Sequence, residues 1–146
     1  MAMHVFKLTL IGLISGTVLA SFMQIIYIIT GNKAYFLLYN VDYIPLLHYY
    51  ESSVIVMISF HFIFCILSIV ILFYLLKFFH LEYHLLPYFL VYTIGAGILF
   101  FLTLLTKEPP SATNFFSWFY WTLGHVVYSL VVAFLIKYWV REKETS

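Results

Sequence analysis

Charged residues are scarce in this chain. Asp, Glu, Lys and Arg together make up 9% of its 146 residues, whereas apolar residues make up 64%, and the mean hydropathy is +1.03. A water-soluble domain carries about 25% charged residues. So little polar surface cannot cover a particle in water. The composition therefore excludes an ordinary soluble domain and makes the lipid bilayer the main solvent of the chain.

Further absences narrow the classes of function. The formal net charge is only +1 and the basic residues are scattered, which excludes an electrostatic nucleic-acid binder. Cys65 is the only cysteine, so the chain can form neither an intramolecular disulfide nor a CxxC redox pair. HExxH, G-x-S-x-G and phosphate-loop motifs are all missing from the sequence. No familiar catalytic signature therefore indicates an enzyme.

Four long apolar stretches are present, at about residues 8–30, 54–76, 85–105 and 118–140. Each approaches or exceeds the roughly 20 residues that a helix needs to cross a bilayer. Their apolar runs are continuous rather than alternating, which is typical of membrane helices and not of barrel strands. The sequence therefore predicts an all-α membrane protein: one integral membrane domain over residues 1–146, built as an antiparallel bundle of four transmembrane helices.

The connections between these stretches predict the topology. Residues 31–53 are too polar to span and rich in aromatic rings that suit the headgroup level, so we expect a short interfacial helix broken near Pro45. By the positive-inside rule the more basic side faces the cytoplasm, which places both termini there. That side receives five basic residues and the outer side two: Lys7, Lys77, Lys137, Arg141 and Lys143 against Lys33 and Lys107.

Small residues recur at spacings that suit close helix packing. Gly12, Gly16 and Ala20 are four residues apart on the first predicted helix, and Gly95 and Gly97 lie on the third. Such stripes let helix backbones approach closely in lipid, where van der Waals contact drives association. We expect these faces to pack within the bundle; the alternative is a seam between two copies in a homo-oligomer.

Polar side chains recur at one depth on three predicted helices. His61 and His125 each lie seven residues, about 10 Å, below the predicted outer end of their helix, and Gln24 lies six residues below its own. Polar groups in a span tend to face the bundle interior and pair with one another. We therefore expect the two histidines to share a hydrogen bond, directly or through one water. The predicted polar layer comprises Gln24, His61, Cys65, His125, Tyr128 and Ser129.

The sequence also resembles a known group of proteins. A glycine-rich first helix, a histidine in the second and the run GHVVY at residues 124–128 in the fourth resemble small bacterial membrane proteins of the YagU and YqhR type. The resemblance covers most of the chain in layout, and its motifs are short. It implies a multi-pass, four-helix protein of the bacterial plasma membrane and no particular activity.

Three functions fit these observations. Missing catalytic groups, short loops and the small-residue stripe favour a non-enzymatic accessory, assembly or regulatory protein that acts within the bilayer, on a membrane-protein partner or as a homo-oligomer. The layer around His61 and His125, and a weak likeness between hairpins 8–76 and 85–141, allow a small transporter or channel. The same histidines allow a haem- or metal-binding redox protein, although we expect no cofactor. His80, Glu82 and His84 are interpreted as a solvated turn rather than a metal site.

Overall fold

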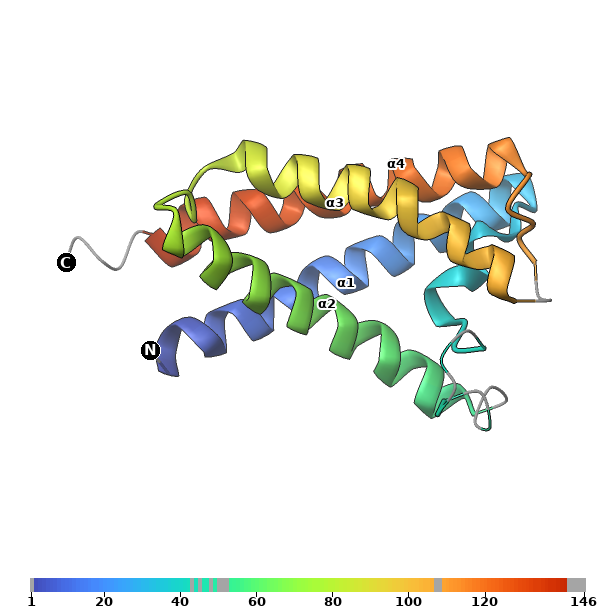
Figure 1. Cartoon of the computed structure of the whole chain (residues 1–146), viewed down its shortest axis with the longest axis horizontal. Helices are drawn as coiled ribbons and strands as arrows, with labels where there is room; N and C mark the ends of the chain where they lie inside the picture. Colours follow the sequence, from blue (N-terminus) through green and yellow to red (C-terminus); the bar gives the residue numbers. More distant parts are fainter. Residues whose placement is uncertain are drawn as a thin grey trace.

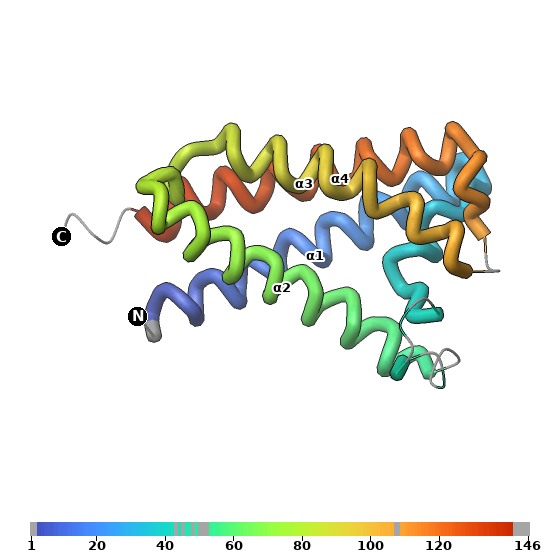
Figure 2. Tube along the Cα trace, viewed as in Figure 1, coloured from blue at the N-terminus to red at the C-terminus, as the bar shows by residue number. Residues whose placement is uncertain are grey.

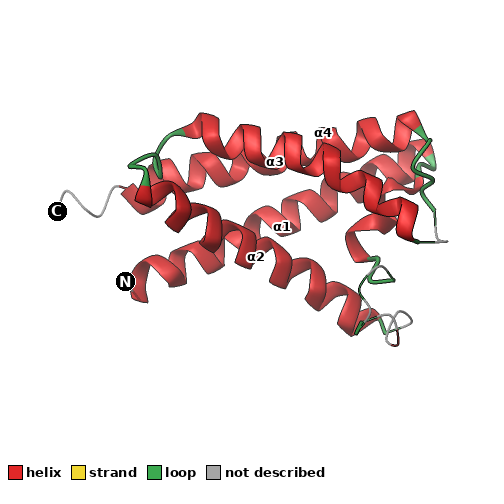
Figure 3. Cartoon of the chain, in the orientation of Figure 1, coloured by secondary structure: helices red, strands yellow, loops and turns green. Residues whose placement is uncertain are grey.

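A computed structural model of the chain describes residues 2–42, 44, 46–47, 49, 53–106 and 109–141, and every regular element in this part is a helix (Figure 3). The prediction of an all-α four-helix bundle is confirmed. The interfacial break expected near Pro45 lies outside the described residues. The long helices are α1 (Ala2–Thr30), α2 (Val54–Phe78), α3 (Leu85–Leu99) and α4 (Phe115–Leu135), joined by the 3-10 helices η1 (Lys33–Tyr39) and η3 (Phe100–Leu105) and the π-helix η4 (Ile136–Val140).

The four long segments are each apolar and long enough to cross a membrane, which makes the chain a multi-pass membrane protein. The third reaches its full length because α3 continues directly into η3. The fourth begins at Phe115, before the predicted start at residue 118. The side chain of Asn114 accepts a hydrogen bond from the Ser117 N–H and so caps the first turn of α4.

The helices form two hairpins, α1–α2 and α3–α4, which meet where α1 packs against α4. α1 packs against α2 and α4, and α3 packs along α4, whereas α2 and α3 contact each other little. Figure 1 shows α2 leaving α3 at a tight turn and diverging toward the opposite end. The start of α1, the α2–α3 turn and η4 lie at one end of the bundle, and η1 and the α3–α4 connection at the other. With four antiparallel spans, the start of α1 and η4 therefore lie on the same side of the membrane.

Two glycines lie where α1 crosses α2. A Cβ added at Gly12 would lie 2.8 Å from the Cα of Ile66, and one added at Gly16 would lie 3.2 Å from the Sγ of Cys65. Only glycine lets the two backbones approach this closely. This face of α1 therefore packs against α2 within the chain, which is the packing expected inside the bundle.

The other small residues of the predicted stripes differ from one another. Ala20 is half-buried, and an added Cβ at Gly97 would make ordinary contacts with Trp118 and Thr122 of α4. Gly95 has no atom within 4 Å of an added Cβ, so it lines open space instead of a helix contact. Gly124 is a close contact that the sequence stripes do not include, since its Cβ would lie 2.6 Å from the Sδ of Met23.

The segment expected to lie in the membrane interface packs into the helix bundle, which the sequence did not predict. η1 contacts α1, α2 and α4, and its Ala34, Leu37 and Leu38 are buried. Phe36 on the opposite side of η1 is 41% exposed. Figure 2 shows η1, in cyan, between α2 and the outer end of α3. Ala34, Leu37 and Leu38 have the spacing of one apolar helical face. The aromatic residues between and around them make this pattern hard to recognise in the sequence.

Hydrogen bonds between side chains join the first and third connections. The Asn40 Nδ2 donates to the Thr106 Oγ1 at 3.1 Å, and the Thr106 Oγ1 donates to the Asp42 Oδ2 at 2.9 Å. The Ser117 Oγ donates to the Asn32 Oδ1 at 3.0 Å. These bonds connect the start of η1 to α4 and its end to η3. They hold η1 in place although α2 diverges from α3 beside it.

Topology can be tested with single cysteines in a Cys65→Ser background. Ser111 and His84 are both exposed and lie at opposite ends of the bundle. A membrane-impermeant maleimide is expected to label Ser111→Cys in intact cells and His84→Cys only after permeabilisation, because five basic residues gather on the His84 side and two on the other. Labelling of His84→Cys in intact cells, with Ser111→Cys protected, would invert the predicted orientation.

Candidate functional site: an apolar cavity between α2 and α3

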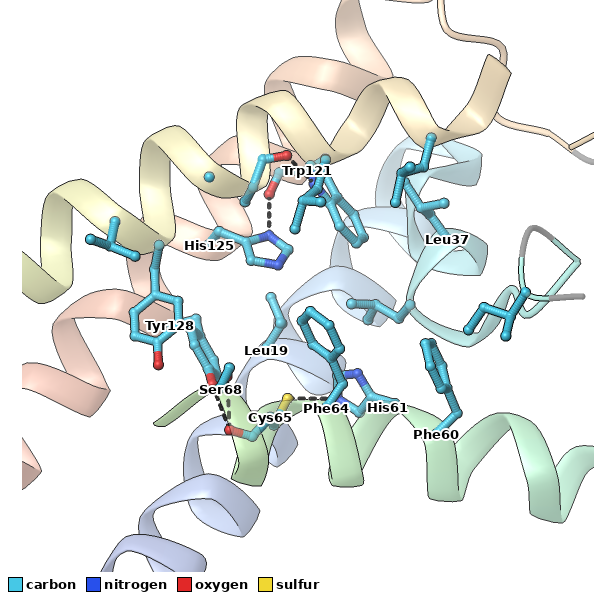
Figure 4. A pocket seen from close by; sticks show the side chains of 18 residues that line it. Leu19, Leu37, Phe60, His61, Phe64, Cys65, Ser68, Trp121, His125 and Tyr128 are labelled. Atoms are coloured by element: carbon cyan, nitrogen blue, oxygen red, sulfur yellow. Dashed lines mark hydrogen bonds between the residues drawn. The ribbon is translucent and has the colours of Figure 1, made fainter. Parts of the chain in front are cut away.

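A cavity of about 390 Å³ lies where α2 diverges from α3, and α1, η1 and α4 also contribute to its wall (Figure 4). Three of its lining side chains also face outward: Phe64 is 53% exposed, Val91 48% and Leu99 41%. Phe64 belongs to α2 and the other two belong to α3. The cavity therefore opens between these two helices, on a surface that membrane lipid would contact.

The two ends of the cavity are closed by apolar side chains. Leu37 and Leu38 of η1 line its outer end. Beyond its inner end lie Ile69, Phe73 and Val132, all fully buried. Protein interiors packed in this way leave few voids larger than a water molecule. As far as the described residues show, the cavity is therefore a pocket that opens to the side and not a path along the bundle axis.

His61 is held in the cavity wall by α1. Its Nε2 lies 3.1 Å from the backbone oxygen of Gly16 and 3.9 Å from the Sγ of Cys65. A carbonyl oxygen can only accept, so Nε2 is the protonated nitrogen and Nδ1 of the neutral ring is an acceptor. The ring of Tyr39 packs over the imidazole at 5.5 Å between centroids. Burial raises the pKa of the Tyr39 phenol well above its usual value, which keeps this neighbour of His61 uncharged.

His125 is held by its own helix. Its Nδ1 lies 2.8 Å from the backbone oxygen of Trp121, so Nδ1 carries the proton and Nε2 of the neutral ring is an acceptor. The Trp121 ring packs against the imidazole at 4.4 Å. Both histidines line the cavity, as Figure 4 shows. Within the described residues no direct hydrogen bond joins them, because each ring bonds a backbone carbonyl instead. The expected contact through one water stays a prediction.

Hydroxyl groups gather at the inner end of the cavity. The Ser68 Oγ and the Tyr128 Oη both donate to the backbone oxygen of Cys65, at 3.0 and 3.4 Å. The ring of Tyr92 meets that of Tyr128 edge to face at 5.0 Å. The Tyr92 hydroxyl is buried and forms no hydrogen bond of standard geometry, but the hydroxyls of Ser68 and Tyr128 lie close enough to interact with it. Three hydroxyl groups therefore gather at this end of the cavity, where they could meet a polar group of another molecule.

Two indole rings fasten α4 to α3 beside the cavity. The Trp121 Nε1 donates to the Ala96 oxygen at 2.8 Å, and the Trp118 Nε1 donates to the Gly97 oxygen at 3.0 Å. These carbonyls lie just before α3 tightens into η3. Trp121 lines the cavity but is not among the site residues predicted from the sequence. Its spacing of four from His125 was the signal that could have indicated it.

The structure brings His61, Cys65, His125 and Tyr128 to one cavity but leaves out the two other members of the predicted layer. Gln24 is exposed, while its neighbour Met23 is fully buried. Residues four apart on an α-helix drift by about 40° per step, so the row that starts at Gly12 has turned toward lipid by Gln24. Ser129 is buried, and its hydroxyl donates to the Val126 oxygen of its own helix at 2.7 Å.

Metal-ligating residues do not gather at this site. Among the described residues, no three His, Cys, Asp or Glu side chains lie close enough to hold one ion. His80 and His84 lie in the turn between α2 and α3, not on one helical face, because α2 ends at Phe78 and α3 begins at Leu85.

No protein-family model, curated protein or solved structure matches this chain, so the interpretation of the cavity rests on its own geometry.

Proposed function

We propose that this chain is a non-enzymatic membrane protein that acts within the bilayer by holding an apolar molecule with a hydroxyl headgroup, such as a long-chain or isoprenoid alcohol. The observation that carries the proposal is the cavity between α2 and α3, open to the lipid side and lined by two imidazole rings. An accessory or regulatory role would follow if such a molecule changes how tightly the protein binds a partner protein in the membrane. We also propose that its membrane is a bacterial plasma membrane, as the resemblance to small bacterial membrane proteins implies.

The apolar part of the ligand is suggested by the wall. Leucine, valine and phenylalanine side chains from five helical segments (α1, η1, α2, α3 and η3) surround the cavity, and its volume lies in the range of small-molecule pockets. Phe64, Val91 and Leu99 continue this wall to the lipid-facing surface. An acyl or isoprenoid chain could enter sideways from the bilayer without crossing a polar barrier.

The headgroup is suggested by the polar atoms that line the cavity. The Nδ1 of His61 and the Nε2 of His125 are acceptors when the rings are neutral, and the Tyr92 hydroxyl is a buried donor beside the Ser68 and Tyr128 hydroxyls. An alcohol hydroxyl can donate to one and accept from another. Leaving a buried polar group unpaired costs about 1–3 kcal/mol, so such a headgroup would be bound more tightly than an alkane of equal length.

The closed inner end favours binding over transport. A channel needs a continuous path through the protein, and the fully buried Ile69, Phe73 and Val132 lie deeper along α2 and α4 than the residues that line the cavity. The transporter alternative gains no supporting observation from this arrangement, and neither does the redox alternative.

Occupancy of the cavity can be measured with Trp121 as reporter. In a chain whose Trp118 and Trp139 are replaced by phenylalanine, a bromine-tagged long-chain alcohol should quench Trp121 fluorescence, because this ring lines the cavity and is only 8% exposed. Gly95→Leu should abolish quenching, since its side chain would extend into the cavity from a position where an added Cβ meets nothing within 4 Å. Ile94→Phe, on the lipid face of the same helix, is the matched control and should leave quenching intact.

The headgroup is tested by comparing the tagged alcohol with a tagged alkane of the same length. His125→Phe keeps a ring but removes the acceptor, so affinity for the alcohol should fall about five-fold while affinity for the alkane stays the same. Equal quenching in the parent chain and in Gly95→Leu would show that the probe acts from the surrounding lipid, and the proposal would be wrong.

A further inference from the structure

A second hollow, of about 540 Å³, lies at the opposite end of the bundle from η1. It is formed by the α2–α3 turn on one side and the end of α4 with η4 on the other, which Figure 1 shows next to each other. Unlike the cavity between α2 and α3, it is lined mainly by polar groups. Its lining residues are His80, Glu82, Tyr83, His84, Leu85, Leu86, Lys137 and Arg141.

The hollow carries an excess of positive charge. Lys137 and Arg141 are four residues apart on η4 and its continuation, so both reach the same side. Among the described residues that line the hollow, Glu82 is the only carboxylate, and the two imidazoles of His80 and His84 add hydrogen-bonding nitrogens. The formal charge of these described lining residues, with the histidines counted as neutral, is +1.

Within the part of the chain that the structure describes, these charges have no carboxylate partner. Lys137 and Arg141 make no ion pair there, and they contact the faces of Tyr138 and Tyr83 at 5.5 and 6.0 Å. Lys7, at the same end of the bundle, is different: it is 6% exposed, and its Nζ donates to the Trp139 oxygen at 2.7 Å. Among the described residues nothing neutralises Lys137 and Arg141, whereas Lys7 serves the contact between α1 and η4.

The surroundings of the hollow are apolar on the side that faces lipid. Leu86, in its wall, is 63% exposed, and Phe78 at the end of α2 is 78% exposed. Both lie at the end of a membrane-spanning helix, where the hydrocarbon meets the headgroups. A molecule that fills the hollow would meet cations with its polar end and these side chains with its apolar end.

We propose that this hollow binds the phosphate headgroup of an anionic phospholipid, with the acyl chains lying along Leu86 and Phe78. Arg141 supplies a planar guanidinium that can bond two phosphate oxygens, and Lys137 supplies a point charge beside it. The proposal is independent of the cavity between α2 and α3 and of any ligand bound in it.

The test uses the full chain purified in a neutral detergent, with bound lipids counted by native mass spectrometry after addition of phosphatidylglycerol or phosphatidylcholine. Phosphatidylglycerol should be retained and phosphatidylcholine lost. Retention should fall about five-fold in Arg141→Gln and further in the double variant with Lys137→Gln, because each cation contributes separately. Lys33→Gln, which removes an exposed cation at the outer end, is the matched control and should retain the lipid.

Further arms separate the sources of the phosphate. Excess inorganic phosphate should not displace phosphatidylglycerol, since it lacks the apolar body; efficient displacement would indicate a free-phosphate site and overturn the lipid proposal. Equal retention of both lipids, or an equal loss in Lys33→Gln and Arg141→Gln, would show a non-specific annulus and overturn it as well. Arg141→Lys keeps the charge and should retain more lipid than Arg141→Gln, which distinguishes lost binding from lost folding.

Discussion

Gly12→Ala is expected to destabilise the protein by about 2 kcal/mol, a large effect for one added methyl group. The new Cβ would lie 2.7 Å from the Cγ1 of Ile66 and 2.8 Å from its Cα. A backbone atom cannot turn aside as a side chain can, so α1 and α2 must separate and lose contacts along their crossing. Overpacking of this kind costs about 1–3 kcal/mol. Unfolding in sodium dodecyl sulfate, followed by far-ultraviolet circular dichroism, measures the change.

The same substitution at two other glycines provides the controls. At Gly16 the added Cβ would meet side-chain atoms of Cys65 and Phe62 at 3.2 Å, which can shift by a few tenths of an ångström, so the loss should be smaller. At Gly95 it would meet nothing, and alanine should be neutral or stabilising by up to about 1 kcal/mol because it favours the helix. If all three variants lose the same stability, close backbone approach is not what holds α1 against α2.

Trp121→Ala is expected to cost about 3 kcal/mol or more in the same assay. The ring is 8% exposed, packs against His125 and donates from its Nε1 to the Ala96 oxygen. Truncation enlarges the existing cavity and leaves that carbonyl without its indole donor, and tryptophan-to-alanine changes in cores cost about 3–5 kcal/mol. Trp121→Phe separates the two contributions: it retains most of the packing and should lose only the hydrogen bond, about 1 kcal/mol in a membrane protein.

Trp139→Ala is the matched control for this prediction. Its ring is 37% exposed, and the atom of Trp139 that binds Lys7 is a backbone oxygen, which the substitution retains. The loss should therefore stay below about 1 kcal/mol. A loss as large as that of Trp121→Ala would mean that the effect follows from removing a tryptophan ring anywhere in α4 or η4, and not from the contacts between α4 and α3 beside the cavity.

The fold class could be predicted from the sequence because it depends on properties that belong to each segment alone. Length and continuous hydropathy predict a membrane span without reference to any other helix, and the structure has four helices that meet these criteria. The helix ends were predicted less well, since they depend on local hydrogen bonds. The cap at Asn114 makes α4 begin at Phe115, earlier than predicted, and the last turns of the third span are the 3-10 helix η3.

The site could be predicted only in part, because it depends on how each helix is rotated about its axis. Apolar residues surround all four helices, so no amphipathic pattern indicates which face looks inward. Depth along the helix brought His61 and His125 to one level, and the structure places both in one cavity. Rotation was not predictable from spacing: Met23 is buried where Gln24 was expected, and Gly95 faces open space where a helix contact was expected.

The sequence by itself determined the solvent of this protein, its all-helical class and the number of apolar segments long enough to span. The tertiary structure alone decided that α2 diverges from α3, that η1 inserts beside the gap, and that each histidine bonds a backbone carbonyl and not its counterpart. The physical reason is that hydropathy is a sum over one segment, whereas a cavity depends on how several segments fail to fill the space between them. That failure is set by the volumes and rotamers of side chains far apart in the chain.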